Sequence, residues 1–169
     1  MIYIKIIVIF LIIVISSMLG NIKSKKYKYR VDELKQMQEA LNIFKTKIKF
    51  TYEPIPEIFK EISKFGETNI SNIFINASKH MNIKSATESW SMALEESETN
   101  MKTEDVNILK SLGNLLGKTD KEGQISEIEL MQTFIETQIS KAEEEKVKNE
   151  KLYKTLGTLA GVAISIILI

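Results

Sequence analysis

The sequence predicts an all-α fold, an antiparallel six-helix bundle flanked by an N-terminal and a C-terminal transmembrane helix. The chain of 169 residues has an apolar, uncharged segment near each end. Apolar residues in the polar middle recur every three or four positions, and strand patterns are almost missing there. We therefore expect a transmembrane helix over 1–22, a cytoplasmic bundle domain over 23–154 and a second transmembrane helix over 155–169.

The first apolar segment covers 6–19. A spanning helix needs about 20 residues, and the lysines at positions 5 and 23 can extend their ammonium groups to the headgroups on either side. The alternative is a cleaved signal peptide, because small residues follow the apolar run. The charges argue against it, since only Lys5 precedes the segment whereas five basic residues follow it between 23 and 30.

The second apolar segment covers 156–169 and follows a lysine-rich stretch at 146–154. The basic residues of both segments thus lie on the side of the chain's middle. The positive-inside rule then predicts that the bundle is cytoplasmic and that both termini lie on the far side of the membrane.

Gly157, Gly161 and Ser165 stand at four-residue intervals in the second segment. Small residues at this spacing line one face of a helix and allow another helix to approach closely. Its partner is either the first span or a second copy of the chain. The alternative is that small residues are simply common in membrane helices.

The helices of the middle are predicted from apolar stripes. Pro54 and Pro56 end the first stripe, because proline suits only the first turn of the next helix. The expected inward-facing residues are Val31, Leu34, Met37, Leu41, Phe44 and Ile48; Ile55, Ile58, Phe59, Ile62 and Phe65; Ile70, Ile73, Phe74 and Ala77; Trp90, Ala93 and Leu94; Val106, Leu109, Leu112 and Leu116; and Ile125, Ile128, Met131, Ile135, Ile139 and Ala142.

Capping residues are expected at the borders of these helices. Gly66 is expected as a left-handed C-terminal cap, and Gly117 as the C-terminal cap of a later helix. The expected N-terminal caps are Asn69 or Ser71, Ser85 with Glu88, Thr103, and Thr119 with Glu122.

Composition excludes several classes of function. Lys+Arg 23 against Asp+Glu 22 gives a net charge of +1, which argues against a nucleic-acid partner. The sequence has no cysteine and one histidine, His80, so a thiolate site and a two-histidine metal site are both excluded. The stretch from Gly113 to Thr119 is one residue short of a phosphate loop and follows a helix, so we interpret its last glycine as a helix cap. We therefore expect that the chain is not an enzyme and that it binds no cofactor, metal or small-molecule substrate.

Two separated segments carry a resemblance to a known family. They are LGNLLGKTDKEGQISEIEL at 112–130 and KLYKTLGTLAGVAISIILI at 151–169, accompanied by an Arg30–Glu33–Leu34 helix start, a Glu53–Pro54–Ile55 turn and Trp90. In this order they resemble the stage III sporulation protein AB family of endospore-forming bacteria. That family is similar to the F-type inner-membrane platform proteins of type II secretion and type IV pilus machines.

The resemblance implies a role as a platform in the stage III A complex, the channel between the mother cell and the forespore. The expected location is the mother-cell membrane around the forespore. The expected partners are the stage III AA secretion-type ATPase, other channel subunits, membrane lipid and further copies of the chain. The family motif at Leu116, Gly117, Thr119, Asp120 and Gln124 is the expected partner-binding surface, and its alternative role is capping of the two adjoining helices. The alternative function is an oligomeric structural scaffold without a motor partner.

Overall fold

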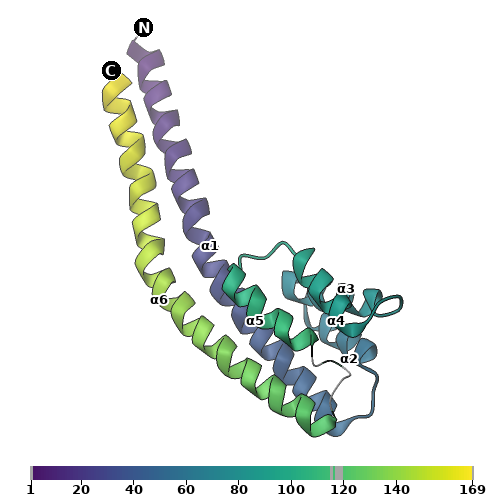
Figure 1. Ribbon diagram of the computed structural model, residues 1–169. Helices are drawn as coiled ribbons and strands as arrows, with labels where there is room; N and C mark the ends of the chain where they lie inside the picture. The colour runs from purple at the N-terminus through teal and green to yellow at the C-terminus, as the bar shows by residue number, and fades with distance from the viewer. Residues whose placement is uncertain (1, 115, 117–119, 169) are drawn as a thin grey trace. The chain divides into compact units, whose positions relative to one another are not determined.

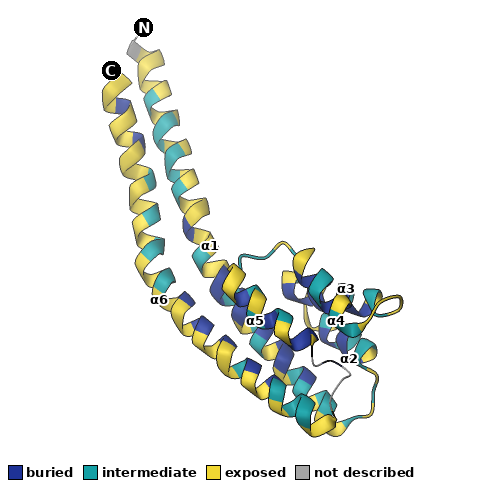
Figure 2. Cartoon of the chain, in the orientation of Figure 1, coloured by how far each residue is buried: buried dark blue, intermediate teal, exposed yellow. Residues whose placement is uncertain are grey.

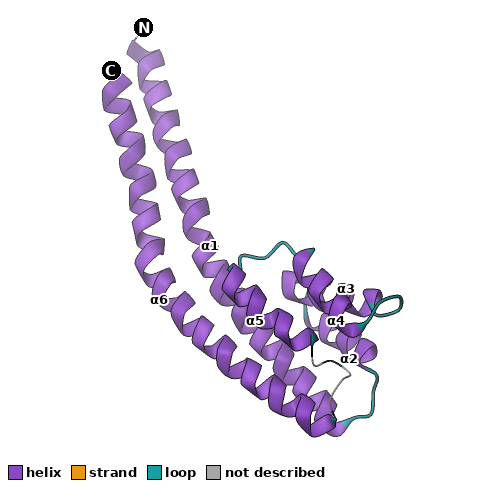
Figure 3. Cartoon of the chain, viewed as in Figure 1, coloured by secondary structure: helices purple, strands orange, loops and turns teal. Residues whose placement is uncertain are grey.

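The computed structural model describes residues 2–114, 116 and 120–168 and is helical almost throughout (Figures 1 and 3). Its elements are α1 (Ile2–Phe50), α2 (Ile55–Ile62), the short 3-10 helix η1 (Ser63–Phe65), α3 (Asn69–His80), α4 (Ala86–Glu95), α5 (Thr103–Gly113) and α6 (Lys121–Leu168). The described residues include no strand. The prediction of an all-helical chain is therefore confirmed.

The first and last helices are by far the longest elements. α1 has 49 residues and α6 has 48, because each runs from an apolar segment into the polar middle without a break. The prediction that a helix starts at Arg30, Glu33 and Leu34 was wrong, since these residues lie inside α1. The lysine-rich stretch before them contains no proline or glycine, so nothing interrupts the helix there.

The chain divides into two compact units. The first consists of Met1–Val31 with Lys141–Ile169, and the second of Asp32–Ser140. Both α1 and α6 contribute to both units. α1 and α6 are also long and apolar enough to cross a membrane.

In the first unit most large apolar side chains are exposed, as the yellow ribbon at the two chain ends shows in Figure 2. A helix in the core of a soluble protein buries such side chains. Exposure of a whole apolar segment is typical of a surface that meets lipid.

The second unit has a core centred on four fully buried aromatic residues, Phe44, Phe59, Phe74 and Trp90. The Phe59 ring lies at its middle, 5.2 Å from Phe44, 5.0 Å from Phe74 and 5.5 Å from Trp90 between centroids. The Trp90 indole N–H donates to the Leu109 carbonyl at 2.6 Å, which satisfies its polar atom and ties α4 to α5. Gly113 lies against the same ring, since a Cβ there would approach Trp90 Cδ1 to 3.1 Å.

Most of the predicted stripes are buried. Phe65 is an exception at 74% exposure, because it stands at the end of η1, where the chain leaves the helical path. Four further stripe residues are half-buried: Ile48, Ile55, Val106 and Ile125.

The helix borders follow local capping chemistry with three departures from expectation. The N-cap of α5 is Lys102 rather than Thr103, which is the first residue of the helix, and Asp105 Oδ2 accepts the Lys102 N–H at 2.7 Å. The capping box of Ser85 and Glu88 is confirmed, with Ser85 Oγ accepting from the Glu88 N–H. The cap of α3 is Thr68 rather than Asn69, and Ser71 completes its capping box. Gly66 ends η1 with φ 154° and ψ 160°, which is not the left-handed helical conformation that was expected.

Candidate functional site

The motif segment before α6 is described only in part. Gly117 and Thr119, with their expected capping and docking roles, lie outside the described residues. Leu116 is 4% exposed and belongs to the core of the second unit, so its side chain offers little surface to a partner.

Asp120 and Gln124 stand at the start of α6. Asp120 is exposed, its Oδ1 accepts the Gly123 N–H at 2.9 Å, and its carbonyl accepts the Gln124 N–H at 3.0 Å. Asp120 is therefore the N-cap of α6, and its negative charge is favoured at a helix N-terminus. Gln124 is half-buried one turn later. The arrangement presents a carboxylate that both caps a helix and faces solvent.

The small residues of the second span lie against α1 within the first unit. A Cβ added at Gly157 would come within 2.8 Å of Gly20 Cα, and one at Gly161 within 2.9 Å of Ile13 Cα. Such distances leave no room for a side chain without a shift of backbone. α1 thus occupies the face of Gly157 and Gly161 that the sequence assigned either to the first span or to a second copy.

Serine hydroxyls line the same contact. Ser16 Oγ donates to the Gly157 carbonyl at 2.6 Å and so joins the two helices directly. Ser165 is buried and donates to the Gly161 carbonyl of its own helix at 2.8 Å. Both bonds satisfy hydroxyl groups inside an apolar surrounding, where an unpaired polar group is costly.

Polar contacts continue this pairing toward the bundle side of the first unit. The Tyr27 and Tyr153 rings stack with centroids 5.7 Å apart, and Lys23 Nζ lies 5.0 Å from the centre of the Tyr153 ring. The buried Arg30 guanidinium donates to Glu145 Oε2 at 2.9 Å. Aromatic and basic side chains at this level are typical of a membrane–water border.

Sequence reasoning missed the role of Glu33. Its carboxylate is 7% exposed and accepts the Asn100 N–H at 2.6 Å, Asn100 Nδ2 at 2.9 Å and Asn69 Nδ2 at 3.4 Å. It therefore holds the loop before α5 and the start of α3 against α1. The signal for it was the acidic residue within a stripe of buried positions, which we interpreted as a helix start.

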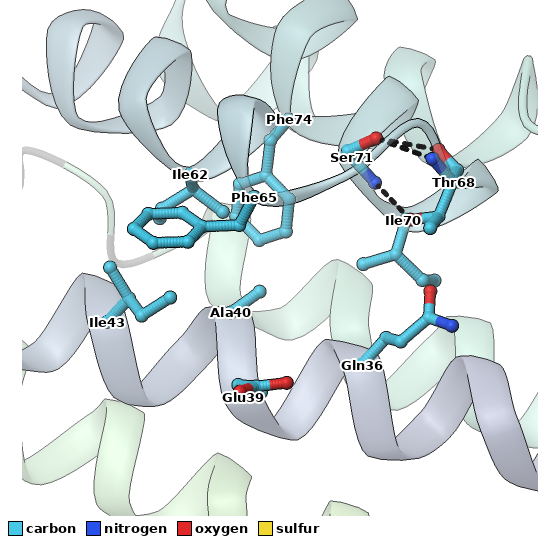
Figure 4. Close-up of a pocket in the computed structure, with 10 residues that line it drawn as sticks. All are labelled: Gln36, Glu39, Ala40, Ile43, Ile62, Phe65, Thr68, Ile70, Ser71 and Phe74. Carbon is cyan, nitrogen blue, oxygen red and sulfur yellow. Dashed lines mark hydrogen bonds between the residues drawn. The ribbon is translucent and has the colours of Figure 1, made fainter.

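A pocket of about 130 Å³ lies between α1, η1 and α3 (Figure 4). Ile43, Phe65 and Phe74 give it an apolar wall, while Gln36 and Glu39 line it from α1. Sites for cofactors and drug-sized ligands usually have roughly 300 Å³ or more, so this space suits one side chain rather than a nucleotide.

Ion pairs and caps shift a few titratable groups of the second unit. The Lys47 ammonium bonds to Glu61, which raises the pKa of Lys47 and lowers that of Glu61. Hydrogen bonds from the Ser85 hydroxyl and backbone N–H lower the pKa of Glu88. His80 Nε2 lies 2.9 Å from Glu96 Oε2 at the surface. Within the described part of the chain, no three His, Asp or Glu side chains are grouped as metal ligands.

Comparisons with known proteins agree with this architecture. The family model described as "Stage III sporulation protein AB" matches residues 5–169. The stage III sporulation protein AB of Bacillus subtilis (strain 168) is 28% identical over 161 residues, which cover 93% of this chain and 94% of the relative. A solved structure of a stage III sporulation protein AB has the same fold, with a TM-score of 0.67 and 23% identity over 71% of this chain and 98% of that one. Because the family model covers nearly the whole chain, the protein belongs to the stage III sporulation protein AB family.

Proposed function

We propose that the chain is a non-catalytic platform in the inner membrane of the sporulation channel between mother cell and forespore. In this role it docks the secretion-type ATPase of the stage III A complex on its cytoplasmic side and couples it to channel subunits in the membrane. Family membership implies the role in sporulation. The docking and coupling are our extension of it.

The observation that carries the proposal is the continuity of the two long helices. α1 and α6 each contain an exposed apolar segment in the first unit and core residues of the second unit, with no loop between them. A hydrogen-bonded helix transmits a displacement better than a flexible linker of the same length. A load applied to the second unit would therefore reach the membrane segments through both helices.

Docking requires an exposed polar surface that a motor protein could recognise. The start of α6 offers the Asp120 carboxylate and, one turn later, the half-buried Gln124. We assign the docking surface to these two residues of the family motif. The buried Leu116 supports this surface from the core rather than contacting the partner.

The scaffold alternative needs a free surface for self-association in the membrane. In the first unit α1 already covers Gly157 and Gly161. Self-association would have to use another face. Because α1 covers the small-residue stripe, the stripe favours the platform over a scaffold that assembles through Gly157 and Gly161.

Gentle solubilisation of the tagged full-length protein from its sporulating host, followed by mass spectrometry, tests the proposal. Recovery of the secretion-type ATPase together with other membrane subunits of the channel supports a platform. Recovery of the chain alone, with the ATPase present in the lysate and stable in the detergent, would favour the scaffold.

A further inference from the structure

Two lysines at the border of the second span have no partner among the residues that the structure describes. Lys148 and Lys151 are exposed, and within the described part of the chain neither ammonium group has a hydrogen bond or an ion pair. Their neighbour Lys154 differs, since its Nζ donates to Glu150 Oε1 at 2.8 Å. Two adjacent positive charges on α6 are thus left to a ligand outside the chain.

The same face of α6 continues into an apolar surface. Positions 148, 152, 155 and 159 follow helical spacing and share one side of the helix. Leu152, Leu156 and Leu159 are exposed along it. An open hollow of about 400 Å³ lies here, lined by Val147, Lys148, Lys151, Leu152, Thr155 and Leu156.

We propose that this face binds an anionic phospholipid of the membrane that the chain crosses. The Lys148 and Lys151 ammonium groups and the Thr155 hydroxyl hold the phosphodiester headgroup. The acyl chains lie along Leu152, Leu156 and Leu159. This inference rests on the proposed insertion of both apolar segments in a membrane.

The order of groups along the helix favours lipid over a protein partner. A phospholipid presents negative charge and then hydrocarbon, and α6 presents unpaired ammonium groups and then exposed leucines that continue directly into the span. The facing segment of α1 adds to the attraction, since residues 23–28 contain four lysines and no acidic residue. Clusters of basic residues next to a span bind anionic headgroups through this charge complementarity.

The test uses the full-length chain reconstituted in phosphatidylcholine vesicles that contain a minority of phosphatidylglycerol. After extraction with a mild detergent, mass spectrometry counts the molecules of each lipid retained per protein. The test variant is Lys148→Gln with Lys151→Gln. The matched control is Lys25→Gln with Lys26→Gln, which removes the same charge from α1 at the same border.

The wild type is expected to retain phosphatidylglycerol well above its share in the vesicles. Because each lysine beside an anionic surface strengthens the attraction roughly fivefold, loss of both should lower the preference of the α6 variant roughly 25-fold, and the α1 control should keep most of it. Equal retention by wild type and α6 variant would overturn the site. An equal loss in the α1 control would overturn it too, because diffuse charge would then explain the preference. An inserted chain without lipid preference refutes only this inference, whereas a chain that does not insert at all refutes the membrane platform as well.

Discussion

The carboxylate of Glu33 joins α1 to Asn100, 67 positions further along the chain, through two hydrogen bonds. One oxygen accepts the Asn100 backbone N–H at 2.6 Å and the other accepts its side-chain amide at 2.9 Å. Both residues lie in the second unit. A single buried carboxylate thus ties the loop before α5 to α1.

Removal of this carboxylate is expected to destabilise the second unit. Glu33→Ala leaves the Asn100 N–H without its acceptor and should lower the free energy of unfolding by about 2 kcal/mol. The single Trp90 is fully buried in the same unit, so its emission during a urea titration of the full-length protein reports this unfolding. Glu39→Ala, on an exposed residue of the same helix, is the control and should change the value by less than about 0.5 kcal/mol. Equal effects of the two variants would contradict the role of Glu33.

The aromatic core predicts a larger effect. Phe59→Ala removes the ring that contacts Phe44, Phe74 and Trp90, and should cost about 3–5 kcal/mol through lost burial and the resulting cavity. Phe65→Ala removes the same ring from a position that is 74% exposed and should be nearly neutral. The same urea titration compares them, and a neutral Phe59→Ala would refute the core as described.

The capping box of α4 predicts a dependence of stability on acid pH. Hydrogen bonds from Ser85 lower the pKa of Glu88 from its ordinary value of 4.5, so the unfolded chain binds this proton more readily than the folded chain. Its contribution is therefore complete above pH 4.5 and is lost as the pH falls through the lower, folded value.

Urea titrations at a series of pH values test this dependence. Glu88→Gln should lose less stability than the wild type between neutral pH and acid pH. Glu67→Gln, which alters an exposed carboxylate without a hydrogen bond among the described residues, should follow the wild type. Parallel curves for wild type and Glu88→Gln would contradict the role of the cap.

The contact between the two apolar segments predicts a cross-link within one chain. A Cβ at Gly161 would lie 3.1 Å from Ser16 Cβ and 2.9 Å from Ile13 Cα, so a small separation of the two helices admits the side chain and brings the two Cβ atoms to the ~3.5–4.5 Å of a disulfide. The sequence has no cysteine to interfere. The pair Ser16→Cys with Gly161→Cys should therefore form a disulfide in a monomer and leave no thiol for a maleimide. In the control, Ala163→Cys replaces Gly161→Cys on an exposed side of α6 and should leave both thiols reactive. A disulfide-linked dimer would instead assign the small-residue face to a second copy.

The apolar stripes were sufficient to predict most of the core of the second unit, because helical spacing and burial are both local properties of the sequence. Phe44, Phe59, Phe74 and Trp90 are all buried as expected. The border between spans and bundle was harder to predict. Nothing in the lysine-rich stretch breaks a helix, so α1 continues through Arg30, where we expected a new one.

The polar contacts could not be predicted from local patterns. Glu33 finds its partner at Asn100 only after the chain has folded back on itself. The cap of α3 was expected at Asn69 or Ser71 but is Thr68. All three residues suit a helix N-terminus, and only the observed hydrogen bonds select Thr68. At the motif, Asp120 was expected to start a helix, but the sequence alone did not reveal that its carboxylate is both a cap and exposed.

The central claim is that the platform binds the secretion-type ATPase through Asp120, and binding of the purified ATPase to the full-length protein in nanodiscs tests it most directly. Asp120→Asn keeps a good N-cap for α6 but removes the charge, whereas Asp120→Ala removes both. We expect both variants to bind the ATPase about tenfold more weakly than the wild type, with Trp90 emission unchanged. Full binding by both variants would contradict docking at Asp120, and no binding by the wild type would contradict the platform itself.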